Sequence, residues 1–311
     1  MTANGVPGTA VVTGGVGFIG RRLVHSLLEQ GRRVRVIDRR PGAPEGCEHV
    51  LADLVENDVT EALHGDVVFH LAGRPGVRGD DVETERQRLR DNVVATQQVA
   101  RATLKEVPLV FASSSSVYGG TLGRPCREDD PFAPRGGYAW SKIAAEQICR
   151  ARAFSGGLVH TARLFTVVGE GQRSDMALAL WADAVAAGRP VTVYGDLNRS
   201  RDFTDVAQAV DALIRLSSLQ TPTVVNVGTG VGQTVGALLD AIGRQLGRQP
   251  EVRLIDAPRQ DPYATLADTT RLRRLVGHVP CTDLVDVVGR YLADDISPMP
   301  NLPNLTEGQL A

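Results

Sequence analysis

The sequence lacks the features that mark several classes of protein. No apolar run approaches the roughly 18 residues that span a bilayer. The formal net charge of −2 over 311 residues gives no electrostatic basis for binding nucleic acid or an anionic membrane. The first residues, MTANGVPGTA, lack the basic region and apolar core of a secretion signal. These absences favour a cytoplasmic protein that binds neither nucleic acid nor membrane.

Cysteine and histidine are also sparse. The four cysteines form no C-x-x-C pair, and the six histidines show no spacing typical of metal ligands. We therefore expect reduced thiols and no metal site. With 42% hydrophobic and 23% charged residues, the composition is that of an ordinary globular protein.

What is present is an alternation of short apolar runs with helical patterns. Strands are expected at residues 9–15, 32–40, 66–73, 107–115 and 158–165. Helices between them are expected at residues 18–31, 92–104 and 138–154. Strands that alternate with helices form parallel sheets covered on both faces. The sequence therefore predicts an α/β fold built on a Rossmann-type doubly wound parallel sheet.

A glycine-rich turn joins the first strand to the first helix. The segment TGGVGFIG contains Gly14, Gly15, Gly17 and Gly20 and satisfies both G-x-G-x-x-G and G-x-x-G-x-x-G. Glycines let backbone N–H groups approach a pyrophosphate, and the helix N-terminus adds partial positive charge. Asp38 ends the next strand about 20 residues later, where dinucleotide-binding turns have an acid. The pattern predicts a dinucleotide site.

The residues around the second strand bear on which dinucleotide binds. Asp38 can accept hydrogen bonds from both ribose hydroxyls and would repel a 2′-phosphate, which favours NAD. Arg39 and Arg40 follow at once, and an arginine there could accept that phosphate, so NADP stays open. Asp53, in LADL, could receive the adenine amine or could be a loop aspartate without a ligand.

Two further segments carry candidate chemistry. The segment YAWSK places Tyr138 and Lys142 one helical turn apart on the same face. A nearby ammonium should lower the pKa of the tyrosine and make it a usable base. The serine run SSSSVYG, residues 113–119, follows a buried strand. Open α/β sheets bind ligands at the carboxyl ends of their strands, so we expect these hydroxyls to face a ligand.

As an ordered set, TGGVGFIG, Asp38, HLAG, SSSSVYG, YAWSK and RDFTDV resemble the extended short-chain dehydrogenase/reductase family, from about residue 8 to residue 295. They are most similar to its UDP-glucuronate and UDP-glucose 4-epimerases. The resemblance implies NAD, a UDP-sugar substrate and a homodimer. It implies an NAD-binding Rossmann domain over 1–165, to which 203–230 returns. It also implies a smaller C-terminal α/β domain that binds the nucleotide sugar, formed by 166–202 and 231–311.

The resemblance also assigns roles to single residues. Tyr138 would be the acid/base on the sugar O4, Ser114 its hydroxyl partner, and Lys142 the holder of the nicotinamide ribose. Further cofactor contacts are implied at Gly14, Gly17, Phe18, Ile19, Gly20, Asp38, Arg39, Asp53, Leu54, Leu71 and Ala72. Substrate contacts are implied at Arg78, Asn92, Ser115, Ser116, Thr166, Arg173, Arg201 and Arg259. Against these, Asn92 could be a helix cap, and each arginine could be solvated.

The serine run separates the reactions of the family. The 4,6-dehydratases of the family have Thr-Asp-Glu here, and its UDP-glucuronate decarboxylases usually have Thr-Ser-Glu-Val-Tyr-Gly. Ser115 and Ser116 supply no carboxylic acid. The sequence therefore favours NAD-dependent 4-epimerisation through a transient 4-keto sugar. A UDP-glucuronate decarboxylase, a nucleotide-4-ketosugar reductase and a non-catalytic dinucleotide sensor stay open.

Overall fold

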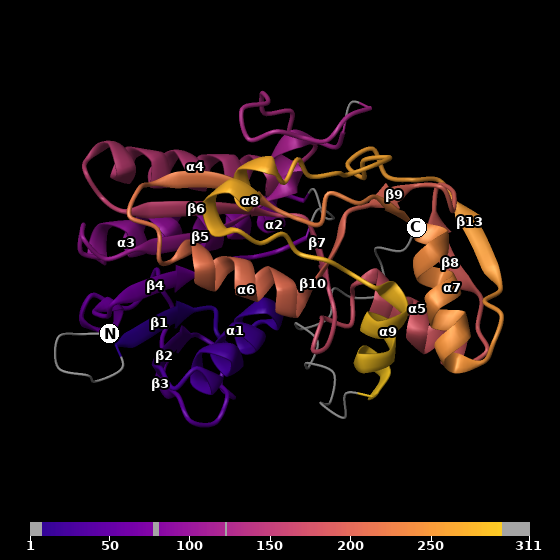
Figure 1. The fold of residues 1–311 in the computed structure, drawn as a ribbon, viewed down its shortest axis with the longest axis horizontal. Coiled ribbons are helices and arrows are strands. Elements are labelled where there is room, and N and C mark those ends of the chain that lie inside the picture. Colours follow the sequence, from indigo (N-terminus) through magenta and orange to yellow (C-terminus); the bar gives the residue numbers. More distant parts are fainter. Residues whose placement is uncertain (1–7, 77–80, 122, 294–311) are drawn as a thin grey trace.

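The structure, a computed structural model, describes residues 8–76, 81–121 and 123–293. Its centre is a parallel sheet of seven strands in the order β11-β6-β5-β4-β1-β2-β3 (Figure 1). The strands are β1 (Thr9–Thr13), β2 (Arg33–Asp38), β3 (Glu48–Leu51), β4 (Val67–His70), β5 (Leu109–Ser114), β6 (Val159–Leu164) and β11 (Thr223–Val227). The expected fold class is confirmed. The strand order reverses between β1 and β4, and such a switch point is where open α/β sheets bind ligands.

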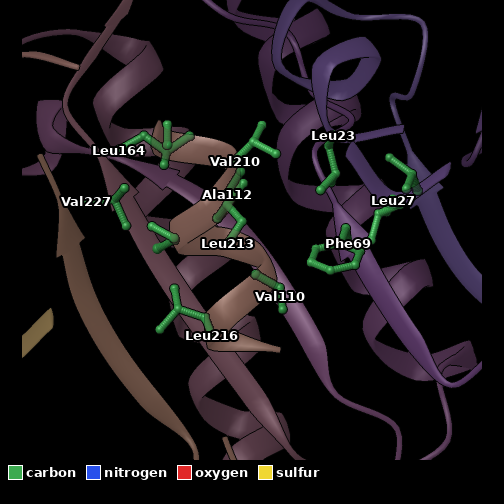
Figure 2. Packing of buried hydrophobic residues seen from close by; sticks show 14 of the residues in the cluster. Leu23, Leu27, Phe69, Val110, Ala112, Leu164, Val210, Leu213, Leu216 and Val227 are labelled. Carbon is green, nitrogen blue, oxygen red and sulfur yellow. The ribbon is translucent and has the colours of Figure 1, made fainter. Parts of the chain in front are cut away.

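One face of the sheet is covered by α1 (Phe18–Glu29) and α6 (Val206–Leu216). Leu27 of α1 lies beside Phe69 of β4 (Figure 2). Leu213 and Leu216 of α6 lie beside Val110 of β5 in the same view. The core on this face therefore joins a helix from the start of the chain to one from its second half.

The opposite face is covered by α3 (Ala95–Ala102) and α4 (Gly137–Phe154). Side chains alternate between the faces of a strand, so Phe111 points to this face while Val110 points to the other. The helix α2 (Val82–Arg88) and a π-helical turn, η2 (Leu89–Val94), lead into α3. A short 3₁₀ helix, η1 (Glu61–Leu63), lies between β3 and β4.

A second hydrophobic cluster lies away from the large sheet, at the right of Figure 1. It is enclosed by α5 (Ala177–Ala186), α7 (Val235–Leu246), α9 (Leu284–Ala293), β8 (Val191–Tyr194) and its parallel partner β13 (Val252–Ile255). Two short pairs join β7 (Thr166–Val168) to β10 (Phe203–Asp205) and β9 (Ser200–Arg201) to β12 (Gln233–Thr234). The remaining helix, α8 (Thr270–Val276), buries Leu272 in the core of the large sheet. The domain boundaries expected from the sequence stay a prediction.

Within the described ranges, no helix is long and apolar enough to cross a membrane. The same residues contain no group of three His, Cys, Asp or Glu side chains able to hold a metal ion. All four cysteines fall inside these ranges and are free thiols.

Candidate active site

The glycine-rich turn follows β1, at the switch point of the sheet. Gly14 has a φ of +74°, and a Cβ on it would lie 2.6 Å from the amide nitrogen of Ala72. A Cβ on Gly20 would lie 2.2 Å from the carbonyl oxygen of Gly14. Any larger residue at these positions would displace backbone. The close approach leaves a backbone cradle, which fits a dinucleotide pyrophosphate.

The helix α1 supplies donors to this cradle. It begins at Phe18 after Gly17, and no side chain among the described residues caps it. The N–H groups of its first turn, including that of Ile19, are therefore available to an anion. Leu71 lies at the opposite edge of the cradle, where its amide donates to the Thr13 carbonyl over 3.1 Å.

Asp38 lies at the end of β2, and Arg40 folds back onto it. The Arg40 amide and Nε donate to Asp38 Oδ1 over 3.0 and 3.2 Å, and Nη2 donates to Oδ2 over 3.2 Å. The Val16 amide also donates to Oδ2, over 3.1 Å. The charge of Arg40 is thus paired with the acid that would repel a 2′-phosphate. This arrangement fits NAD better than NADP.

Arg39 also forms ion pairs with carboxylates. Its guanidinium forms a two-bond pair with Asp91, over 3.2 and 2.9 Å, and reaches Asp53 over 3.3 Å. Arg90 pairs with Asp53 from the other side, over 3.0 Å. Leu54, next in the chain, is buried in the core beneath α3. Direct contacts of Arg39, Asp53 and Leu54 with the cofactor stay predictions.

The three candidate catalytic side chains converge beside this cradle. Ser114 ends β5, and its hydroxyl forms a hydrogen bond with the phenol of Tyr138 in the first turn of α4. Lys142, one turn further along α4, is buried. Its Nζ donates to the Ala112 carbonyl over 2.8 Å and lies 5.0 Å from the centre of the Phe111 ring. The fold therefore brings together the residues that the sequence singled out.

The pKa values of this group differ from the simple expectation. Burial raises the pKa of Tyr138, while the Ser114 hydrogen bond and the charges of Arg173 and Arg88 act in the opposite direction. Burial also lowers the pKa of Lys142 to about 8. The expected lowering of the Tyr138 pKa is wrong, because burial raises this pKa by more than Ser114, Arg173 and Arg88 lower it.

The four serines at positions 113–116 lie in different surroundings. Ser113 points into the protein and donates to Glu146 over 2.5 Å, and Glu146 in turn pairs with the buried Arg163 over 2.8 Å. Ser114 caps a short 3₁₀ helix, η3 (Ser115–Tyr118), and accepts a hydrogen bond from the Ser116 amide over 3.1 Å. Ser113 is therefore a structural residue, whereas the next three serines remain candidates for ligand contact.

A cavity of about 230 Å³ opens beside Ser114. Its walls include Ser115, Ser116, Thr166, Arg201, Asp261 and Thr265. The Ser116 hydroxyl is buried without a hydrogen-bond partner among the described residues. A wider cleft of about 500 Å³ shares Arg135 and Gln260 with this cavity and also contains Arg259. Arginines therefore line both hollows, and the wider one also includes Gly137, the residue before Tyr138.

The predicted substrate-binding arginines differ in their partners. Arg201 donates to Asp261 over 2.6 Å, and Asp261 also pairs with Arg199 over 3.2 Å. Arg173 pairs with Asp175 over 2.8 Å, and its charge acts to lower the pKa of Tyr138 against the larger effect of burial. Arg259 is exposed in the wider cleft. Arg78 lies outside the described residues.

Asn92 is buried in η2 and holds neighbouring segments together. Its Oδ1 accepts from the Arg74 amide over 2.6 Å, and its Nδ2 donates to the Arg74 carbonyl over 3.1 Å and to Ser141 Oγ over 2.9 Å. These bonds join the segment after β4 to the helix of Tyr138. A direct contact of Asn92 with substrate stays a prediction.

Four residues of this region were not anticipated from the sequence. Arg135 and Asp261 line the cavity, Glu85 contacts the first residue of α4, and Arg88 pairs with Glu85. Asp261, two residues after Arg259, could have been noticed from that proximity. Nothing in ETERQRLR distinguishes Arg88 from an exposed helical arginine.

A parallel sheet with a glycine-rich turn after its first strand, an acid at the end of its second strand and a Ser–Tyr–Lys group is typical of a dinucleotide-dependent enzyme of the Rossmann type. Comparison with known proteins agrees. The model of the NAD dependent epimerase/dehydratase family matches residues 10–228. The chain therefore belongs to this family and is an NAD-dependent enzyme.

Individual relatives are similar over nearly the whole chain. UDP-glucose 4-epimerase of Mycolicibacterium smegmatis is 31% identical over 90% of this chain and 96% of its own length. The uncharacterized UDP-glucose epimerase YtcB of Bacillus subtilis is 29% identical, over 91% of this chain and 96% of its own. A solved structure of MoeE5 in complex with UDP-glucuronic acid and NAD is 35% identical, with a TM-score of 0.86, over 92% of this chain and 98% of that one.

Proposed function

We propose that the protein catalyses the NAD-dependent 4-epimerisation of a UDP-sugar, with UDP-glucuronate as the first candidate substrate. The observation that carries the proposal is the Ser114–Tyr138–Lys142 group, in which Ser114 lines a cavity together with Ser115 and Ser116. The similarity to MoeE5, whose structure contains UDP-glucuronic acid, supports the choice of sugar.

The side chains divide the first chemical step between them. The glycine-rich turn and Asp38 would hold NAD, which would supply the acceptor for the C4 hydride and allow its return to the other face of the sugar. Tyr138 takes the O4 proton as the C4–O4 bond becomes a carbonyl, and it returns this proton when the new alcohol forms. Ser114, hydrogen-bonded to Tyr138, would hold O4 in line. Lys142 would hold the nicotinamide ribose. The steps balance because the proton taken by Tyr138 and the hydride taken from C4 both return to the sugar.

The serines next to Ser114 support epimerisation over the alternatives. Elimination of water needs a carboxylic acid/base near the sugar, and Ser115 and Ser116 cannot provide one. If the sugar is a uronate, their hydroxyls and N–H groups can hold its carboxylate without promoting loss of CO₂. The Ser116 hydroxyl, which has no hydrogen-bond partner in the described part of the chain, can donate to such an oxygen. Decarboxylation remains the second candidate reaction.

The diphosphate of the substrate would bind at the cationic end of the cavity. Arg201 and Arg259 are the candidate partners, because a guanidinium offers two parallel N–H donors to phosphate oxygens. Burial lowers the pKa of Arg201, and Asp261 opposes this effect and helps to keep it charged. We infer that Asp261 also orients Arg201 toward the ligand.

The test is a substrate panel with product identification by NMR, using UDP-glucuronate, UDP-glucose and UDP-N-acetylglucosamine. We expect UDP-galacturonate from UDP-glucuronate, with little pentose. UDP-xylose as the main product would contradict the epimerase proposal. An epimerase regenerates NAD in every turnover, so the purified protein should release NAD on denaturation. Turnover that consumes added NADH or NADPH would instead indicate a ketoreductase.

We also propose that the protein is a cytoplasmic homodimer. The surface of α2, η2 and α4 carries exposed apolar side chains, namely Val82, Leu89, Trp140 and Phe154. Apolar groups of this size on adjacent helices are typical of an association surface. The free thiols suit a reducing compartment.

A further inference from the structure

Arg88 is a buried arginine in the wall of the active site. It is 1% exposed, at the end of α2. In the same helix, Arg86 pairs with Glu83 at the same spacing, but both of those side chains are exposed. Burying a guanidinium is costly unless its charge and donors are satisfied. Stabilising the helix therefore does not by itself explain why Arg88 is buried.

The partners of Arg88 connect two parts of the site. Its Nη1 donates to Glu85 over 2.5 Å, and its Nη2 donates to the Gly76 carbonyl over 3.1 Å. The Glu85 carboxylate rests against Gly137, the first residue of α4, where a Cβ would lie 1.8 Å from Oε2. The pair therefore touches the residue that immediately precedes Tyr138.

The segment Gly73–Gly76 is held at both ends from the same helical run. Asn92 binds the amide and carbonyl of Arg74, and Arg88 binds the carbonyl of Gly76. This segment passes close to Lys142, since a Cβ on Gly73 would lie 3.7 Å from its Nζ. Because Asn92 and Arg88 are four residues apart, one side of α2 and η2 sets the path of the segment.

We propose that Arg88, together with Glu85, is a positioning residue of the reaction. It fixes the segment 73–76 on one side and the start of α4 on the other, and so holds Tyr138 in place to accept the O4 proton. This inference rests on the proposed function for its rate measurements, and it deepens that function by adding a residue that no sequence pattern marked.

Electrostatics support the geometry. Arg88 acts on the phenol of Tyr138 together with Arg173, and both oppose the effect of burial on its pKa. Ser114 forms a hydrogen bond with the same phenol from β5. Two further charged groups lie nearby. Lys142 is one turn further along α4, and Glu85 of α2 contacts Gly137, the first residue of α4. Removing the charge of Arg88 should therefore make the phenolate harder to form.

The deciding variant is Arg88→Met, which keeps the length of the side chain and removes its charge and donors. We expect kcat to fall about 10- to 100-fold, as for other small misplacements of a reacting group. The ascending limb of kcat against pH should move to higher pH. Arg88→Lys should keep that limb near its wild-type position while restoring only part of kcat. Arg86→Met, in the exposed pair, is the matched control and should behave as wild type.

A direct titration separates this inference from the proposed function. The phenolate absorption of Tyr138, taken as the difference between each protein and its Tyr138→Phe counterpart, needs no substrate. A higher apparent pKa in Arg88→Met supports the inference even if no UDP-sugar is turned over. An unchanged titration and an unchanged pH profile in folded Arg88→Met and Arg88→Lys would overturn it. If Arg88→Met does not fold, Arg88→Lys with wild-type kcat and titration would also overturn it.

Discussion

At the scale of single residues, burial decides the chemistry as much as residue type does. Burial disfavours the charged form of both Tyr138 and Lys142. The sequence spacing identified the pair, yet it could not reveal how strongly burial shifts the pKa of each side chain. Ser114 therefore carries more weight than its small hydroxyl suggests, because it favours the phenolate directly.

Replacing Ser114 with alanine should reduce turnover far more than substrate binding. The variant loses a hydrogen bond to the reacting phenol, and loss of one such donor commonly costs about 100-fold in kcat. Steady-state kinetics with the active UDP-sugar would measure kcat and KM separately. Ser218→Ala, on the exposed surface after α6, is the control. A Ser114→Ala variant with wild-type kcat would remove the residue from the mechanism.

Two buried histidines make stability depend on pH. Burial lowers the pKa of His70 to about 3 and that of His160 to about 4, from a usual value of 6.5. The unfolded chain takes up these protons below pH 6.5 while the folded protein does not, so stability is full above that pH and is lost as the pH falls. Each histidine should cost about 2 kcal/mol of the free energy of unfolding by pH 5.

Denaturant unfolding at several pH values, at constant NAD occupancy, measures this loss. His70→Asn and His160→Asn should each flatten the dependence between neutral pH and pH 5, whatever their effect on stability at pH 7. His25, which is exposed, provides the control substitution. Wild-type slopes in both buried-site variants would contradict the assignment.

At the scale of elements, the glycine-rich turn and α1 together form the cradle for the cofactor. The backbone at Gly14 and Gly20 approaches so closely that the turn can have only one shape. The cradle is therefore set by packing before any ligand arrives, which favours tight retention of a cofactor.

Gly20→Ala should lose bound NAD. The new Cβ would lie 2.2 Å from the Gly14 carbonyl, so the turn must open. We expect the NAD content of the purified protein to fall at least about tenfold, an effect of roughly 1.4 kcal/mol or more on binding. Gly232→Ala, where a Cβ meets nothing closer than 3.7 Å, is the matched control. Full NAD content in Gly20→Ala would show that the turn tolerates a side chain.

The elements themselves could be predicted because burial imposes a pattern on the sequence. Five strands of the large sheet, namely β1, β2, β4, β5 and β6, and the helix of Tyr138 lie close to where the apolar runs placed them, whereas β3 and β11 were not predicted. The helix expected at 92–104 begins instead within a π-helical turn, which local propensity does not reveal. Ion pairs were less accessible, because Arg201 meets Asp261 across 60 residues and Arg39 meets Asp91 across 52. Such partners depend on the finished fold.

At the scale of the whole molecule, two hydrophobic cores meet around the candidate site. The cavity takes Ser114 from the large sheet and Arg201 from a short strand pair outside it. A substrate that spans the cavity would therefore contact both parts. The surface on the far side of α4 offers Trp140 and Phe154 to another molecule.

We expect Trp140→Glu to convert the proposed dimer to a monomer. Its side chain is 61% exposed, and a charge buried at an apolar contact would oppose association. Light scattering coupled to size exclusion measures the mass directly. Leu254→Glu, at an equally exposed leucine on β13, is the control and should leave the mass unchanged. A monomeric wild-type protein, or a dimeric Trp140→Glu variant, would exclude this surface.

The bond between Arg40 and Asp38 has a consequence for how cofactor preference could evolve. The Asp38 carboxylate would repel a 2′-phosphate, and it also pairs with Arg40, the cation best placed to bind that phosphate. Replacing Asp38 with a small neutral residue would remove the repulsion and release Arg40 in a single change. Arg39, held by two other acids, would not take part. A single substitution at Asp38 should therefore change the cofactor preference from NAD toward NADP. The end of β2 is the place to begin engineering the use of NADP.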